Sequence, residues 1–466
     1  MDVVKIDAGY VSGTVLGELE NPVHIYRGIP YAAPPIGDLR WKPPRAVTPW
    51  SGIRECTTFS AIAPQTPMFA GAPKTTIGIE SEDCLYLNIL TPAKLAAETL
   101  PVMVWMHGGG FTSLSGNDKY CNSLALPSKQ VVLISVNMRL GPLGCLAHPL
   151  LSRESPQGVS GNYLFLDMVA ALKWVQKNIS AFGGDPDNVT IFGESGGSGK
   201  VINLMASPLA KGLFHRAIGE SGVGRGTLLK EMEARGEVVF AKLGVDKERD
   251  PLASARALPW GNIIEAGQAV DPDMKLPRGP WDSAVDGWFL QDTPGNIFKA
   301  GRQNAVPFIM GANLGELTGP GAIVMPWLIP GYVNLFTGAG KVGGKAYAYI
   351  FDHVPAGWKK GGVVAGHAME VPYVFGNLDN RVLWDFAFMV AKPPGVKAVA
   401  VDPGLTDKDR QVSEMMMNLW INFAKTGNPS LKGVIDWPAW EQDTDQYLYI
   451  TDTLQAKSGF SKIAQK

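Results

Sequence analysis

The feature that most limits the fold is an apolar run that leads straight into a glycine-flanked serine. It reads Val189-Thr-Ile-Phe-Gly-Glu-Ser-Gly-Gly197. The β-branched, apolar half predicts a buried strand, and the G-x-S-x-G half predicts a sharp turn into a helix. Side chains in place of the flanking glycines would clash when that helix packs back on the strand. We therefore expect Ser195 at the carboxyl end of a sheet strand, at a helix N-terminus, where open α/β sheets place their sites.

Strand-like and helix-like patterns alternate along the chain and predict an α/β fold. Short apolar runs that end near Gly or Asn occur at residues 102–106, 131–136, 189–192 and 308–310. Their continuous apolar character predicts strands covered on both faces, as in a mostly parallel sheet. Helical spacing of apolar residues occurs at 163–179 and 413–425. This alternation favours a parallel sheet with helices on its faces.

The chain has 466 residues, of which 45% are hydrophobic and 18% charged, enough for a large core. Its 54 glycines and 35 prolines are spread throughout rather than pooled in a linker. We predict a single domain over residues 1–466, with cap or lid excursions at about 223–281 and 317–366.

Charge and cysteine content argue against several classes of partner. Lys and Arg total 42 against 43 Asp and Glu, a net charge of -1, and no basic run occurs, so no nucleic-acid partner is expected. No apolar stretch is long enough to span a membrane, and the first residues lack the pattern of a signal peptide. The four cysteines are scattered, which favours free thiols over a disulfide framework or a zinc site. A reducing, cytoplasmic setting is expected.

Two competing interpretations of the serine region are weaker. Ser221, in Gly219-Glu-Ser-Gly222, lacks the second glycine because Val223 occupies that position. A phosphate-binding loop would need glycine at position 194 and Ser or Thr at position 201, where the chain has Glu and Val. Ser195 is therefore the preferred nucleophile, and Lys200 is expected to be a surface or helix lysine.

A triple-glycine segment, His107-Gly-Gly-Gly-Phe111, follows the strand-like residues 102–106. Three successive glycines expose backbone N–H groups, as in the loop that completes the oxyanion hole of lipases and esterases. A simple flexible turn is the alternative interpretation. We expect His107 to support the loop.

A serine nucleophile also needs a base and a carboxylate that orients the base. In α/β-hydrolases the chain order is Ser, Asp or Glu, then His. His353 and His367 are the histidines that lie well after Ser195, and the pattern does not choose between them. Glu316 follows the strand-like residues 308–310 and is suitably placed for the acid, although other carboxylates remain open.

Several further motifs resemble the type-B carboxylesterase family, which includes the cholinesterases and bacterial para-nitrobenzyl esterases. The similar segments are residues 26–40, 81–89, 137–144, 182–197 and 423–429. The resemblance covers nearly the whole chain. It implies an α/β-hydrolase fold, with a mostly parallel central sheet, helices on both faces and lid excursions. It also implies a serine esterase that needs no metal or organic cofactor.

The same resemblance assigns the site residues that the pattern left open. The family's acid falls on Glu316 and its histidine on His367, which precedes Glu370-Val-Pro-Tyr-Val-Phe-Gly376. The oxyanion donors fall on the backbone of Gly109, Gly110 and Gly196. Phe111 and Glu194 are expected to contact substrate, and Glu194 is also expected to bond within the wall of the site.

Four departures from the family pattern carry their own expectations. Gly196 stands where relatives often have Ala, which predicts a less rigidly held donor. The acid motif reads Leu314-Gly-Glu-Leu317 rather than x-D-E-G, and Ala63 stands where relatives with a disulfide have the partner of Cys84, so no bridge is expected. Glu316 and His367 are 51 positions apart, a shorter interval than in many relatives. This trimming predicts a more open pocket that accepts bulky esters.

The expected activity is hydrolysis of a small-molecule carboxylic ester through an acyl-enzyme. Amide, carbamate or lactone hydrolysis is an alternative, because the same triad serves these reactions. A non-catalytic binding relative is a further alternative, but all three triad positions hold chemically competent residues.

Overall fold

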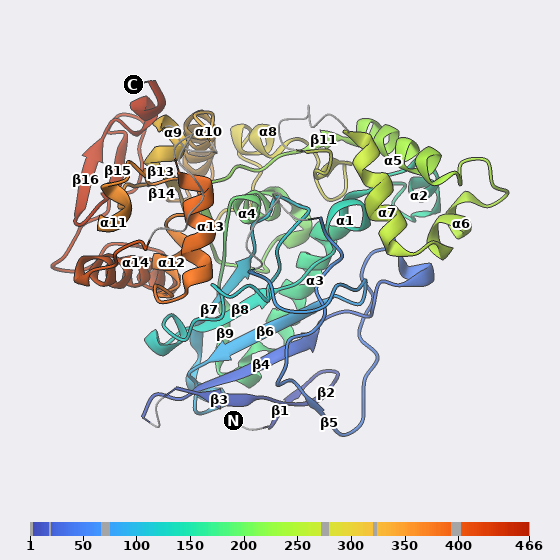
Figure 1. The fold of residues 1–466 in the computed structure, drawn as a ribbon, viewed down its shortest axis with the longest axis horizontal. Coiled ribbons are helices and arrows are strands. Elements are labelled where there is room, and N and C mark those ends of the chain that lie inside the picture. Colours follow the sequence, from blue (N-terminus) through green and yellow to red (C-terminus); the bar gives the residue numbers. More distant parts are fainter. Residues whose placement is uncertain are drawn as a thin grey trace.

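The computed structural model describes residues 3–17, 20–66, 75–271, 279–319, 324–392 and 402–465. Its centre is an 11-stranded sheet (Figure 1). In spatial order the strands are β16 (Leu454–Ser458), β15 (Gln446–Ile450), β14 (Ala346–Phe351), β13 (Phe308–Asn313), β10 (Arg216–Glu220), β9 (Gly184–Glu194), β7 (Leu100–Met106), β8 (Val132–Val136), β6 (Tyr86–Thr91), β4 (Val23–Pro30) and β3 (Thr14–Leu16).

The middle of this sheet is parallel, as the continuous apolar runs predicted. Strands β15, β14, β13, β10, β9, β7 and β8 pair parallel in that order, while β6, β4, β3 and β16 pair antiparallel at the two ends. Strand β10 was not anticipated, because only Ala217 and Ile218 of its five residues are apolar. It lies between β9 and β13, so Ser221 follows the strand next to the one that carries Ser195.

Both faces of the sheet are covered, which explains the unbroken apolar strands. Along β7, Val102, Val104 and Met106 belong to one hydrophobic cluster, and Met103 and Trp105 belong to the other. The helices are α1 (Gly141–Cys145), α2 (Pro149–Glu154), α3 (Tyr163–Asn178), α4 (Gly196–Ala206), α5 (Leu229–Leu243), α6 (Pro251–Ala257), α7 (Trp260–Gly267), α8 (Pro294–Lys299), α9 (Leu314–Thr318), α10 (Leu328–Lys341), α11 (Ala356–Lys359), α12 (Val371–Val374), α13 (Arg381–Ala391) and α14 (Asp407–Thr426).

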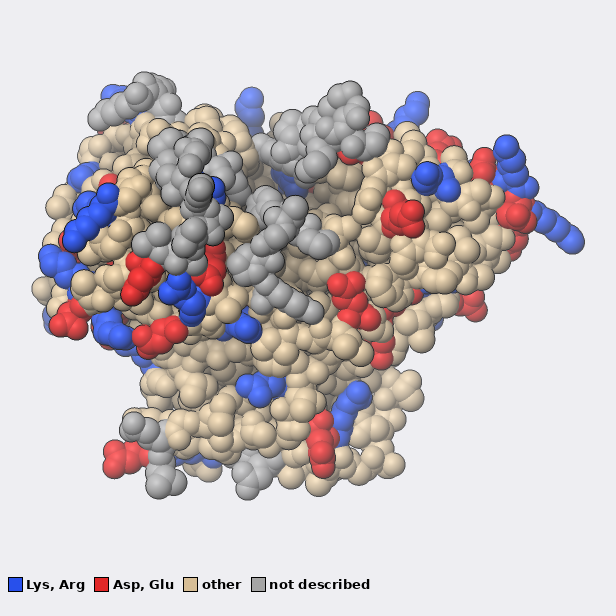
Figure 2. Space-filling view, in the orientation of Figure 1, with Lys and Arg blue, Asp and Glu red and all other residues tan. Residues whose placement is uncertain are grey.

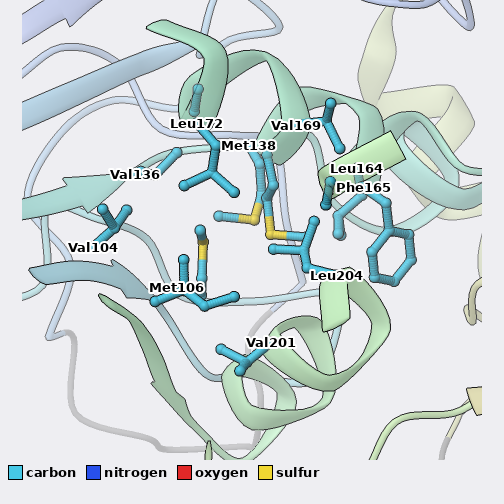
Figure 3. Packing of buried hydrophobic residues seen from close by; sticks show 14 of the residues in the cluster. Val104, Met106, Val136, Met138, Leu164, Phe165, Val169, Leu172, Val201 and Leu204 are labelled. Carbon is cyan, nitrogen blue, oxygen red and sulfur yellow. The ribbon is translucent and has the colours of Figure 1, made fainter. Parts of the chain in front are cut away.

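Helices α3 and α4 supply the first cluster, and α12, α13 and α14 supply the second. Figure 3 shows the first cluster, in which Val201 and Leu204 of α4 lie near Met106 of β7. The two helices expected from spacing are confirmed as α3 and α14, and α14 ends at Gly427 in a left-handed conformation. Helix α4 is therefore packed firmly on the strand that leads into the glycine loop.

The two ranges expected to leave the sheet, at about 223–281 and 317–366, contain both helices outside the sheet and one sheet strand. Helices α5, α6 and α7 project from the sheet at the right of Figure 1, within residues 223–281. Residues 317–366, expected to form a lid, include β14, which is hydrogen-bonded between β13 and β15. That excursion therefore ends with α10, because the aromatic run at 346–351 returns to the sheet. Residues 272–278 and 320–323 of these ranges lie outside the described residues.

Smaller features complete the description. Strands β1 (Val3–Ile6), β2 (Gly9–Ser12) and β5 (Ile53–Glu55) form a separate sheet, and β11 (Thr227–Leu228) pairs with β12 (Ala284–Val285). On the face seen in Figure 2, positive and negative side chains are interspersed. Of the helices in the described ranges, none has the length and apolar character needed to cross a membrane. All four cysteines are buried and free.

Candidate active site

Ser195 occupies the turn between β9 and α4, as the sequence predicted. Its backbone has φ 57° and ψ -120°, a conformation that costs energy for any residue with a Cβ. The Ser195 N–H donates to Glu220 O at 2.8 Å, and the Ser221 N–H donates to Gly311 O at 2.8 Å. Ser195, just past β9, is thus bonded to β10, and Ser221, just past β10, is bonded to β13. These bonds fix the strained turn to the sheet.

The glycines around Ser195 are required by close backbone approaches. A Cβ on Gly197 would lie 2.0 Å from Met106 O, and one on Gly196 would lie 2.2 Å from Gly110 O. The glycine at position 196, where relatives often have Ala, therefore has a local reason. The glycine loop lies so close to the start of α4 that no side chain fits between them.

The glycine loop faces the same turn. Gly109 and Gly110 have φ of 77° and 61°, in the left-handed region that glycine adopts readily. Both line a cavity together with Ser195. Within the described residues, the N–H groups of Gly109, Gly110 and Gly196 donate to no protein acceptor. These amides are available to an oxygen of a bound substrate.

The cavity over Ser195 has a volume of about 330 Å³ and is mostly apolar. Its lining also includes Trp105, Leu114, Tyr120, Glu194, Met325, His367, Val371, Leu383, Phe386 and Val390. Phe111 does not line this cavity. It is buried edge-on against Phe165, with ring centroids 5.4 Å apart, and lines a second hollow that shares Gly110 with the first.

The structure brings His367, and not His353, beside the expected acid. His367 Nδ1 lies 2.7 Å from Glu316 Oε2, and both side chains are buried. Glu316 is held at the start of α9 by the Asn313 N–H, which donates to Glu316 Oε1 at 2.7 Å. His353 instead bonds Asp409 and Asp452, both at 2.8 Å. The choice that the sequence pattern left open therefore falls on His367.

The other ring nitrogen of His367 points to Glu194. The Nε2–Oε1 distance is 3.1 Å, an ion-pair contact without hydrogen-bond alignment. No hydrogen bond joins Ser195 Oγ to His367 in the described part of the chain, although both side chains line one cavity. Burial lowers the pKa of His367, but the carboxylates of Glu194 and Glu316 outweigh it and raise the pKa overall. Burial raises the pKa of Glu194, and the carboxyls of Glu370 and Glu316 raise it further, whereas His367 lowers it.

Two residues behind the acid were not recognised from the sequence. Ser221 Oγ lies 2.5 Å from Glu316 Oε1 and 3.1 Å from Glu370 Oε1. A hydroxyl has one proton to donate, so a protonated Glu370 is needed to satisfy both contacts. Burial and the nearby Glu316 raise the pKa of Glu370 to about 7, which fits this requirement. The near-match around Ser221 and the position of Glu370, three residues after His367, were the available signals.

Lys200 was expected at the surface or on a helix, and the structure corrects the first possibility. It lies on α4 but is completely buried, and its Nζ donates to His107 O at 2.7 Å. Burial of this side chain was not visible in the sequence because the helix packs against the glycine loop rather than facing solvent.

In the described ranges, no group of three or more His, Cys, Asp or Glu is arranged to hold a metal ion.

The carboxyl edge of the parallel sheet thus has the layout of a serine hydrolase. A family model described as the carboxylesterase family matches residues 1–327 and 328–465. The chain belongs to the carboxylesterase family, has the α/β-hydrolase fold and is a carboxylic ester hydrolase.

Named relatives cover most of the chain. It is 34% identical to the fumonisin B1 esterase of Sphingopyxis macrogoltabida, over 92% of this chain and 84% of that protein. It is also 34% identical to the para-nitrobenzyl esterase of Bacillus subtilis, over 94% and 93% of the two chains. A solved para-nitrobenzyl esterase structure matches with a TM-score of 0.83 at 29% identity, covering 98% of this chain and 97% of that one. The Geobacillus stearothermophilus carboxylesterase matches with a TM-score of 0.78 at 27% identity over 100% of both chains.

Proposed function

We propose that Ser195, His367 and Glu316 form the catalytic triad, with the amides of Gly109, Gly110 and Gly196 as the oxyanion hole. The observation that carries this proposal is the 2.7 Å contact from His367 Nδ1 to Glu316, at the edge of a cavity that Ser195 also lines. The Nδ1 proton bonded to Glu316 leaves Nε2 as the basic nitrogen. His367 and Ser195 line the same cavity, so an Nε2 released from its contact with Glu194 meets the need for a general base.

The proposed reaction follows from these positions. Ser195 Oγ attacks the ester carbonyl while His367 Nε2 takes the hydroxyl proton, and the carbonyl oxygen becomes an oxyanion facing the three amides. His367 then gives the proton to the leaving alkoxide, which departs as the alcohol. A water deprotonated by His367 attacks the acyl-enzyme, and the carboxylic acid is released. The ester group displaces the Glu194 contact from Nε2 as it aligns Ser195 with the imidazole.

The cavity supports small-molecule esters with a bulky apolar group as substrates. Its walls are mainly aliphatic and aromatic side chains, and apolar area of this kind favours burying an apolar acyl or alcohol group. Gly110 lines both this cavity and the second hollow, where Phe111 lies, so a long substrate that extends past Gly110 would find room on both sides of the loop. The printed names of the relatives, fumonisin B1 esterase and para-nitrobenzyl esterase, also favour sizeable esters. Glu194 is placed to contact both His367 and substrate.

The proposed setting is the reducing cytoplasm. The support is that Cys56, Cys84, Cys121 and Cys145 are all buried and free. Such thiols are stable where glutathione and thioredoxin keep cysteines reduced.

Organophosphate labelling followed by peptide mapping tests the nucleophile. We expect phosphorylation on the peptide that contains Ser195, with complete loss of activity. Ser195→Ala is expected to fold normally and lose about 10⁶ in rate. Ser221→Ala is the comparison: it is expected to keep labelling at Ser195 and to lose only about tenfold in rate, because its hydroxyl contacts Glu316 and does not line the cavity. Labelling of Ser221, or labelling that survives Ser195→Ala, would overturn the assignment.

A further inference from the structure

The side chain of Lys200 contacts the glycine loop and does not line the cavity over Ser195. It is 0% exposed, and its Nζ donates to His107 O at 2.7 Å and to Gly108 O at 3.4 Å. The ring centroid of Phe111 is 5.9 Å from the same nitrogen. Among the described residues it forms no ion pair with a carboxylate, so backbone carbonyls are its hydrogen-bond acceptors.

Of the two carbonyls that Lys200 contacts, the nearer is His107 O at 2.7 Å, and the more distant, Gly108 O at 3.4 Å, belongs to the peptide group that matters for catalysis. Gly108 C=O and Gly109 N–H are the two ends of one planar peptide unit. His107 Nδ1 lies 3.1 Å from the same Gly108 oxygen, so two side-chain nitrogens hold this carbonyl. A hydrogen-bond donor at the carbonyl end fixes the orientation of the plane and draws electron density away from the N–H end. The Gly109 amide becomes a stronger donor, because bonded dipoles polarise one another in a low-dielectric interior.

Lys200 also connects this peptide rigidly to the nucleophile. It is five residues after Ser195 on α4, whose first turn fits against β7 through Gly197. Val201 and Leu204 anchor the next turn beside Met106 (Figure 3). The position of the Lys200 amine is therefore fixed by the same helix that has Ser195 at its start. Movement of the loop relative to the nucleophile would break the Lys200 contacts.

A purely structural need for Lys200 is a poor explanation. Burying an ammonium group without a carboxylate partner is costly, and an apolar side chain of equal length would fill the space at lower cost. Burial lowers the pKa of Lys200 to about 7, which reflects that cost. Buried charges that destabilise a fold are commonly kept for function.

We propose that Lys200 is a positioning residue for the oxyanion hole, which holds and polarises the Gly108–Gly109 peptide against the nucleophile helix. The inference rests on the proposed triad and oxyanion hole. The carbonyl oxygen of the ester substrate gains negative charge only as the tetrahedral intermediate forms. Lys200 therefore stabilises the transition state and not the bound ester. It touches no reacting atom.

The test compares Lys200→Met with the unchanged protein on 4-nitrophenyl acetate. Met has nearly the same length but neither charge nor N–H donors. We expect kcat to fall about 10- to 100-fold with KM nearly unchanged, less than the loss on deleting an oxyanion donor itself. Affinity for a phenyl trifluoromethyl ketone, which forms a tetrahedral adduct on the serine, is expected to fall by the same factor. Lys200→Gln keeps an uncharged donor and is expected to lie between the two.

Asn203→Leu is the matched control. Asn203 is buried on the same helix and donates to Ser283 Oγ at 3.0 Å, away from the loop. We expect it to lower Tm without changing kcat or ketone affinity, while Lys200→Met keeps or raises Tm as it loses rate. If Lys200→Met fails to fold, Lys200→Gln carries the same comparison.

The proposal is overturned if both Lys200 variants keep full kcat, or if only KM rises, or if ketone affinity stays constant. Organophosphate titration of the variants separates this result from failure of the triad. Intact labelling of Ser195 with normal kcat would reject the Lys200 role alone, whereas absent labelling of the unchanged protein would reject the triad.

Discussion

The two sides of Ser195 differ in the chemical groups that form them. On one side the imidazole of His367 is surrounded by buried side-chain carboxyls: Glu194, Glu316 and, one step behind, Glu370. On the other side the groups are backbone amides, and the buried side chain behind them is Lys200, whose amine donates to backbone carbonyls. The acid side depends on which side chains are present and how they are protonated. The loop side depends on backbone conformation, so glycine positions matter more than functional groups there.

The largest expected effect is on the acid side, from Glu316→Gln. Glu316 Oε1 accepts from the Asn313 N–H and is bonded to Ser221, so a glutamine would place its amide oxygen there. Its NH₂ group would then face His367 Nδ1 and force the proton onto Nε2, which can no longer act as a base. We expect kcat to fall about 10⁴-fold, the scale of a wrong-tautomer substitution in another triad.

This loss is measured in discontinuous assays at high enzyme concentration. Glu316→Asp, which keeps the charge, is the comparison. Activity of Glu316→Gln within tenfold of the unchanged protein would contradict the orientation role.

The next effect tests the loop side, with Gly196→Ala. The added Cβ would lie 2.2 Å from Gly110 O, so the loop or the helix must shift. We expect kcat to fall about 10²-fold with little change in KM, as when one oxyanion donor is lost. Gly261→Ala is the control, since nothing lies within 4 Å of its added Cβ. Unchanged kcat in Gly196→Ala would show that the loop relaxes freely, which would weaken the contrast between the two sides.

A smaller effect is expected from Ser221→Ala. It removes one hydrogen bond from Glu316, which keeps the bond from the Asn313 N–H. The loss of one hydrogen bond to a charged group is worth about 1.5 kcal/mol, or roughly tenfold in kcat. Ser198→Ala, which removes a bond of 3.0 Å to Gly222 O, is the neighbouring control with no carboxylate partner. Steady-state kinetics on one ester compare the two, and equal losses would remove the special status of Ser221.

The smallest effect is a shift in pH dependence, from Glu194→Gln. Glu194 and Glu316 raise the pKa of His367 above its usual value, and a protonated His367 cannot act as base. Activity is therefore lost as pH falls through the raised pKa. Removal of the Glu194 charge lowers that pKa, so the acidic limb of kcat/KM is expected to move to lower pH. Glu248→Gln, on the surface, is the control; a limb that stays in place or moves upward would contradict this account.

The sequence was informative about backbone and less so about burial. The turn at Ser195, the glycine loop and the parallel strands all follow from local patterns, because glycine spacing and apolar runs report directly on backbone geometry. Pattern made Glu316 a candidate acid and left His353 and His367 open, and the family resemblance then selected Glu316 and His367. The structure places these two in direct contact, whereas their assignment as a triad with Ser195 stays a proposal.

The misses have a common physical cause. Strand β10 was not recognised because a strand with Arg216, Gly219 and Glu220 lacks an apolar run, yet its burial comes from neighbours on both sides. The surface alternative for Lys200 was wrong for the same reason, since its side chain meets the loop at residues 107 and 108. A side chain's environment in these cases is set by contacts with residues some 90 positions away, which no local window contains.

The bonds from Ser195 to Glu220 and from Ser221 to Gly311 have a wider consequence. Three adjacent strands lead into Ser195, Ser221 and the segment that carries Glu316. Neighbouring strands in any β-sheet lie about 4.8 Å apart. The strand spacing thus sets the distance between the nucleophile and its acid. Changes in α13, whose Leu383, Phe386 and Val390 line the cavity, reshape its wall without altering that spacing, so new ester preferences can arise by remodelling the wall alone.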